Sequence, residues 1–136
     1  MREIKFRAWI MEENKMIFPI AVHQNDNTIQ RYKVQEWEDI PDNLNGVMWY
    51  TFPDECILMQ FTGLKDKFGK EIYEGDILEI TNQTSELKGS KVSVVFKEGC
   101  FCDGYYGWRL SQHKEYNLEI IGNIYENPEL LSPPLS

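Results

Sequence analysis

Acidic side chains are the residues of this chain that could most directly carry out a reaction. A cluster of carboxylates could supply a general acid and a general base, and the candidates for it are Asp54, Glu55, Glu74, Asp76 and Glu79. Such a site needs two carboxylates within several ångströms of each other, in surroundings that separate their pKa values. Asp66 and Asp76 stand beside glycine-containing turns, where carboxylates commonly accept hydrogen bonds from nearby backbone N–H groups. We therefore expect these two residues to stabilise turns, and we keep a small-molecule enzyme that uses clustered carboxylates as an alternative.

The cysteines and histidines could in principle bind a metal. Cys100 and Cys102 stand two positions apart, so both thiols would lie on one face of a strand. A structural zinc site needs four ligands, and the spacing of Cys56, His23 and His113 does not supply the other two. We therefore predict three free thiols, no metal and no cofactor, and we expect both histidines to be solvated loop residues.

Glycines recur every six residues at positions 63, 69 and 75. A phosphate-binding glycine loop is followed by a helix whose N–H groups point at the anion. Strand-like sequence follows these glycines instead, and no Gly-Lys-Ser or Gly-Lys-Thr motif occurs. We therefore do not expect a phosphate-binding loop, and we predict that the protein is not an enzyme.

Two groups of aromatic and basic residues could contact a partner. One lies on a single face of the first predicted strand and the other follows the Cys-x-Cys pair; together they are Lys5, Arg7, Trp9, Tyr105, Tyr106, Trp108 and Arg109. Interleaved aromatic and cationic side chains can bind single-stranded nucleic acid on a small barrel. The net charge of −8 repels phosphate, however, so a protein partner or a second copy of the chain is favoured.

The composition is typical of a folded protein. The chain has 136 residues, of which 42% are hydrophobic and 13% aromatic, and we expect one domain over residues 1–136. No run of about 18 apolar residues occurs, so no membrane span is predicted. The first residues lack the apolar core of a secretory signal, and we expect the protein in the cytoplasm.

Short β-prone runs alternate with turn signals along the whole chain. The predicted strands are residues 3–9, 15–18, 28–34, 47–52, 56–62, 77–81, 91–96, 100–102 and 117–125. One helical turn is expected at residues 35–39 and another after Asn127, which could cap it, and Gly122 is expected at a bulge or close approach. This pattern predicts a mainly β protein, either a small distorted barrel or a folded-over antiparallel sheet, with one or two short helical turns.

Three segments together are similar to a known family. They run from Arg2 to Trp9, from Met59 to Ile77 and from Ile120 to Pro128, and their order and spacing resemble the YopX family of phage and prophage proteins. The resemblance implies a single YopX-like domain, a mostly β fold and a phage or prophage origin. It transfers no activity and no catalytic residue. One departure is Ile10, because family members often have Asp after the tryptophan that corresponds to Trp9.

These observations lead to three functional hypotheses. The first is a non-enzymatic phage or prophage accessory protein in the bacterial host cytoplasm, which binds a host or phage protein or itself. Its contact residues would be the aromatic and basic groups around Trp9 and Trp108. The second is a nucleic-acid-binding β module, and the third is the carboxylate enzyme.

Overall fold

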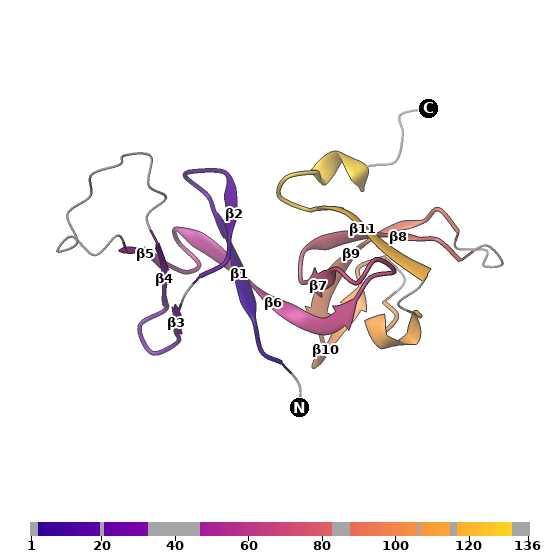
Figure 1. Cartoon of the computed structure of the whole chain (residues 1–136), viewed down its shortest axis with the longest axis horizontal. Coiled ribbons are helices and arrows are strands. Elements are labelled where there is room, and N and C mark those ends of the chain that lie inside the picture. The colour runs from indigo at the N-terminus through magenta and orange to yellow at the C-terminus, as the bar shows by residue number, and fades with distance from the viewer. Residues whose placement is uncertain are drawn as a thin grey trace. The chain divides into compact units, whose positions relative to one another are not determined.

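The computed structural model describes residues 3–19, 21–32, 47–82, 88–105, 107–114 and 117–131. The chain divides into two compact units (Figure 1), an N-terminal unit of residues 6–59 and a C-terminal unit of residues 1–5 and 60–136. Strand β6 (Cys56–Lys65) crosses from the first unit into the second. The single domain over residues 1–136 stays a prediction.

The N-terminal unit is built from short antiparallel strands. β1 (Phe6–Ile10) pairs with β2 (Lys15–Ile17) through a turn at residues 11–14. β3 (Ala21–His23), β4 (Thr28–Tyr32) and β5 (Val47–Thr51) form a three-stranded sheet in that order. Inward-facing side chains of the strands in this unit pack together and form one hydrophobic core. The buried residues of this core are Ala8, Ile10, Ile17, Ile29, Tyr50 and Cys56.

The C-terminal unit contains a four-stranded antiparallel sheet in the order β10-β9-β8-β11. Its strands are β8 (Asp76–Ile80), β9 (Lys91–Lys97), β10 (Cys100–Asp103) and β11 (Leu118–Asn123). The short strand β7 (Glu71–Tyr73) pairs with the end of β6. Alternate apolar residues of β8 and β9 face inward, and the cluster they join consists of Ile72, Leu78, Ile80, Val92, Val94, Leu110 and Leu118.

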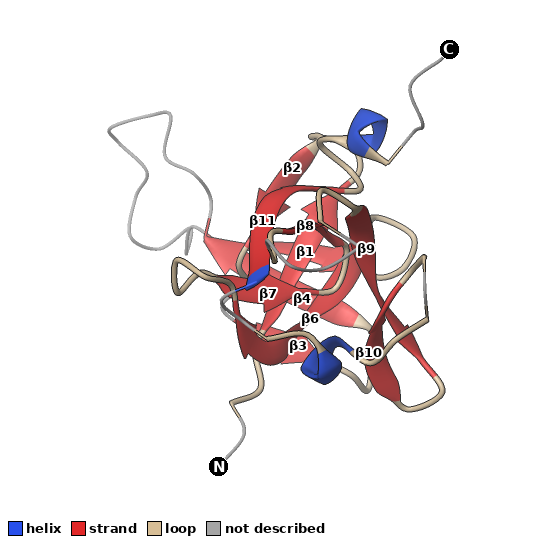
Figure 2. Cartoon of the chain, turned by 90° about the vertical axis from the view of Figure 1, so that its right-hand side faces the viewer, coloured by secondary structure: helices blue, strands red, loops and turns tan. Residues whose placement is uncertain are grey.

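The helical part of the described chain is small, as Figure 2 shows. It includes the 3₁₀ turns η2 (Leu110–Gln112) and η4 (Pro128–Leu130). The predicted mainly β fold, built from antiparallel strands with short helical turns, is therefore confirmed. The turn expected at residues 35–39 lies outside the residues that the structure describes.

Gly122 and Asn127, near the end of the chain, each test a prediction made from the sequence. The pairing of β11 with β8 shifts register between Ile120 and Gly122, so the predicted irregularity at Gly122 is confirmed. A Cβ atom on Gly122 would lie 2.5 Å from Asn127 Oδ1, which leaves room only for glycine. The expected cap at Asn127 is wrong, because its side chain makes no capping bond to η4. Its Oδ1 accepts the Asn123 N–H instead, at 3.3 Å.

Candidate binding surface

Two buried aspartates hold turns of the C-terminal unit in the same way. Asp66 Oδ1 accepts the N–H groups of Phe68 and Lys70, each at 2.9 Å. Its second oxygen accepts the Ile120 N–H at 3.1 Å and so ties the β6–β7 turn to β11. Asp76 Oδ2 similarly accepts the Tyr73 N–H at 2.8 Å. The predicted role of Asp66 and Asp76 as turn stabilisers is confirmed.

Asp103 repeats this pattern at the end of β10. Its side chain is buried, and its Oδ1 accepts the N–H groups of Tyr105 at 3.2 Å and Gly107 at 3.1 Å. These are again the second and fourth residues after the aspartate. Its Oδ2 lies 3.3 Å from His113 Nε2. One carboxylate therefore holds three points of the segment from residue 103 to residue 113, which we call the aromatic loop.

Backbone contacts fix the two ends of the aromatic loop. The Asp103 N–H donates to the Trp108 carbonyl at 2.9 Å, and Cys102 forms an isolated antiparallel bridge with Arg109. At Gly104 the chain passes so close to β9 that a Cβ atom would lie 2.5 Å from Ser93 Oγ. These backbone contacts and the close approach at Gly104 therefore fix the course of the chain where the loop leaves the sheet.

The aromatic loop presents large side chains to solvent. Tyr105 is 77% exposed and Trp108 is 47% exposed. The Trp108 ring stacks on His113, with a centroid distance of 5.8 Å and an interplanar angle of 29°. Arg109 is exposed, and its backbone N–H donates a hydrogen bond to Gln112 Oε1 at 3.1 Å. The exposed surface of the loop thus consists of Trp108, Tyr105 and Arg109, and the hydrogen bonds of Asp103 hold the backbone beneath them. The predicted contact Tyr106 lies outside the described residues.

The structure corrects the prediction for His113. We expected a solvated loop histidine, but its side chain is only 9% exposed and lies between Asp103 and Trp108. The local sequence around His113 is polar and gives no sign of this burial. The contact joins Asp103 to a residue ten positions later, and the bridge between Cys102 and Arg109, which are seven positions apart, folds the intervening chain back on itself.

The first aromatic and basic group does not form an exposed surface. Arg7 is only 7% exposed and Trp9 only 8%, because both faces of β1 are covered and not one, as the alternation predicted. Lys5 Nζ lies 2.9 Å from Glu71 Oε2 and 3.2 Å from Glu3 Oε1. Hydrogen bonds to Glu71 and then to Glu3 raise the pKa of Lys5. Arg7 and Trp9 therefore do not lie on an exposed face, and the role of Lys5, Arg7 and Trp9 as partner contacts stays a prediction.

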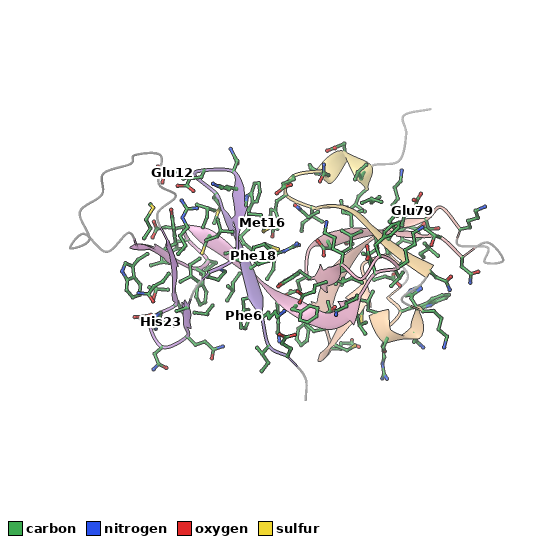
Figure 3. The ribbon with its side chains drawn as sticks, in the orientation of Figure 1. Phe6, Glu12, Met16, Phe18, His23 and Glu79 are labelled. Atoms are coloured by element: carbon green, nitrogen blue, oxygen red, sulfur yellow. The ribbon has the colours of Figure 1, made fainter. Side chains whose placement is uncertain are left out.

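The candidate acids are used mainly as backbone acceptors. Within the C-terminal unit, Glu74 Oε1 accepts the Gln60 N–H at 3.1 Å, while buried Asp76 bonds within its own turn. Glu79, labelled in Figure 3, stands three positions after Asp76 on β8, so the two side chains leave opposite faces of the strand. Within the N-terminal unit, Asp54 is exposed and Glu55 Oε1 accepts the Thr51 N–H at 3.1 Å. Three of these five acids, Glu55, Glu74 and Asp76, therefore accept a backbone N–H, and the carboxylate enzyme stays a hypothesis.

The three cysteines are free thiols, as predicted. Cys56 is buried in the N-terminal unit, and this burial raises its pKa to about 11. Cys100 and Cys102 have their Sγ atoms 3.3 Å apart, which confirms that they share a face of β10. Over the described part of the chain, no group of three or more His, Cys, Asp or Glu side chains is arranged to hold a metal ion.

The N-terminal unit has an open hollow of about 460 Å³. Its lining consists of Phe6, Val22, His23, Gln24, Asn25 and Asp26, of which Phe6 and His23 are labelled in Figure 3. His23 is exposed, as expected, but it is the last residue of β3 and not a loop residue, and its Nε2 lies 3.2 Å from Gln30 Oε1. Its ring also packs on Trp49 at 5.4 Å. Four of the six lining residues are polar, so the hollow differs from the mostly apolar pockets that bind small molecules.

Comparison with known proteins identifies a family and structural relatives. The profile of the family described as YopX protein matches residues 5–132. Protein EF1440 from Enterococcus faecalis has a similar crystal structure, with a TM-score of 0.68, 28% sequence identity and coverage of 97% of this chain and 100% of that one. The X-ray structure of yopX from Bacillus subtilis is also similar, with a TM-score of 0.61, 19% identity and coverage of 98% of both chains. No curated protein matches the sequence significantly.

A helix that is both long and apolar enough to cross a membrane does not occur in the described residues.

Proposed function

This chain belongs to the YopX family, and from that premise we propose that it is a non-enzymatic binding protein that docks a protein partner on the aromatic loop. The observation that carries the proposal is the support of exposed Tyr105 and Trp108 by buried Asp103. The proposal includes a phage or prophage origin and action in the bacterial host cytoplasm.

The residue types of the aromatic loop favour a protein partner. Tryptophan, tyrosine and arginine are enriched among the residues that dominate binding energy at protein interfaces. The exposed part of the loop offers one of each, at Trp108, Tyr105 and Arg109. Exposed aromatic side chains are costly to leave in water, so a partner that covers them gains from their burial.

The hydrogen bonds and the ring contact that order the aromatic loop lower the entropic cost of binding a partner. A loop that must be ordered on association loses part of its gross interaction energy. Here two N–H groups are already bound by Asp103 Oδ1, and Trp108 is already stacked on His113. The aromatic surface is therefore in place before a partner arrives.

The same residues support single-stranded nucleic acid as a second candidate partner. Bases can stack on Trp108 and Tyr105, and Arg109 can contact a phosphate. The net charge of −8 opposes this binding, and the burial of Arg7 removes a cation that the nucleic-acid hypothesis used. The protein partner is therefore favoured.

Site-specific photo-crosslinking tests the proposal. Tyr105 is replaced by a benzophenone amino acid in the full chain, which is expressed in bacterial cells and irradiated. A matched control carries the same group at Phe18, which is also an exposed aromatic residue but lies in the N-terminal unit.

The proposal predicts a discrete protein adduct at position 105 and none at position 18. An adduct of twice the mass of the chain would identify the partner as a second copy. A nuclease-sensitive adduct would overturn the proposal in favour of nucleic acid. The same adducts at both positions, or none at position 105, would also overturn it.

A further inference from the structure

The edge strand β10 carries two thiols that face each other. Cys100 and Cys102 lie on the same face of the strand with their sulfur atoms 3.3 Å apart, and neither is in a disulfide. We propose that these two residues are a reversible oxidation site, at which a low-molecular-weight disulfide converts the thiol pair into an intrachain disulfide bond. The proposal does not depend on the function proposed above.

The geometry lets the bond form with a small movement. The sulfur atoms must approach from 3.3 Å to about 2.05 Å. Alternate residues of a strand have Cα atoms about 6.7 Å apart, at the upper end of the range that a disulfide spans. Cys100 is the first residue of β10 and directly follows the turn at Glu98 and Gly99, so it can move toward Cys102 without breaking the middle of a strand.

The two thiols differ in environment, which assigns them different roles. Cys100 is partly exposed, whereas Cys102 is buried. The hydrogen bond with Cys100, followed by burial, raises the pKa of Cys102, so the Cys102 thiol keeps its proton. The partly exposed Cys100 is the sulfur that a small disulfide in solvent can reach. Cys100 is therefore the attacking thiol and Cys102 the resolving thiol.

The reaction balances as two thiol–disulfide exchanges. The Cys100 thiolate attacks one sulfur of the small disulfide, forms a mixed disulfide and releases one small thiolate, which takes up a proton. Cys102 then loses its proton to solvent and attacks the Cys100 sulfur, which releases the second small thiolate; this thiolate takes up a proton. The two protein thiols are oxidised by two electrons, and the small disulfide is reduced to two thiols.

Replacing the buried Cys56 gives a chain in which Cys100 and Cys102 are the only thiols that can react. A Cys56→Ala chain keeps only Cys100 and Cys102, and it can be incubated with glutathione disulfide and followed by intact-mass spectrometry. The expected product is an intrachain disulfide, two hydrogen masses lighter than the reduced chain, which dithiothreitol reverses. In the same background, Cys102→Ser should stop at a glutathione adduct on Cys100, and Cys100→Ser should react at least about tenfold more slowly.

Three results would overturn the proposal. The first is a stable glutathione adduct while both cysteines are present, because Cys102 would then not resolve it. The second is a disulfide between two chains, and the third is the absence of oxidation. Circular dichroism of each variant shows whether it is folded, and Cys102→Ala is a second resolving-thiol variant if Cys102→Ser unfolds.

Discussion

Replacing Asp103 by alanine should loosen the aromatic loop while the sheet beneath it stays folded. The change removes the acceptor of the Tyr105 and Gly107 N–H groups and the partner of His113. Hydrogen bonds to charged groups contribute about 1.5–3 kcal/mol each. The two N–H bonds are long, at 3.2 and 3.1 Å, so about 1.5 kcal/mol for each, or about 3 kcal/mol in total, is the appropriate magnitude.

Amide hydrogen exchange measured by NMR reports this loss residue by residue. A loss of about 3 kcal/mol corresponds to roughly 100-fold faster exchange of the Tyr105 and Gly107 amides. Asp103→Asn is the matched control, because its remaining oxygen can still accept both N–H groups. We expect it to lose about 1 kcal/mol, since a neutral acceptor forms the weaker bond.

Two outcomes would refute this reasoning about Asp103. One is exchange at Tyr105 and Gly107 in Asp103→Ala that stays within about threefold of the original chain, because the carboxylate would then not hold the loop. The other is an equal acceleration at Leu78 and Val92 in the core of the sheet. That result would mean that Asp103 stabilises the whole C-terminal unit and not the loop in particular.

Three further predictions concern stability measured by urea unfolding. Because burial raises the pKa of Cys56 to about 11, protonated Cys56 stabilises the folded chain below pH 9, and this contribution to the free energy of unfolding is lost as the pH rises toward 11. In Cys56→Ala, the fall in the free energy of unfolding over this pH range should be smaller by on the order of 2 kcal/mol. Asp66→Ala should cost about 3–4 kcal/mol because three N–H groups lose their acceptor, and an equally stable Asp66→Ala chain would contradict the role assigned to Asp66. Buried Arg31 has its Nη2 atom 2.8 Å from Oε2 of the exposed Glu13, so Glu13→Ala should cost about 1–3 kcal/mol, whereas Arg31→Met should cost less; the reverse order would count against this ion pair.

Local turn chemistry is the part of this structure that the sequence predicts well. Asp66 and Asp76 bond N–H groups within four residues of themselves, so the pattern of aspartate and glycine is sufficient to predict their roles. Gly122 is similar, because a glycine inside a strand signals a bulge or a close approach. The mainly β fold follows from the same short-range signals, repeated along the chain.

Contacts between distant residues are the part that the sequence does not predict. The alternation around Arg7 and Trp9 indicates a strand, but it cannot show that the face that carries them is buried as well. Nor can the polar surroundings of His113 show that a bridge from β10 brings it against Asp103. Of the two predicted aromatic and basic groups, only the one around Trp108 remains exposed, and tertiary burial decides this.

The most direct test of the proposed function is the affinity of the cross-linked partner for variants of the aromatic loop. With the partner purified, the dissociation constant is measured by calorimetry for the original chain, for Trp108→Ala and for the control Phe18→Ala. If Trp108 is a binding hot spot, Trp108→Ala raises the dissociation constant at least about 30-fold, which is about 2 kcal/mol, and Phe18→Ala changes it less than about threefold. An unchanged dissociation constant for a folded Trp108→Ala chain would contradict the claim that the aromatic loop is the docking surface.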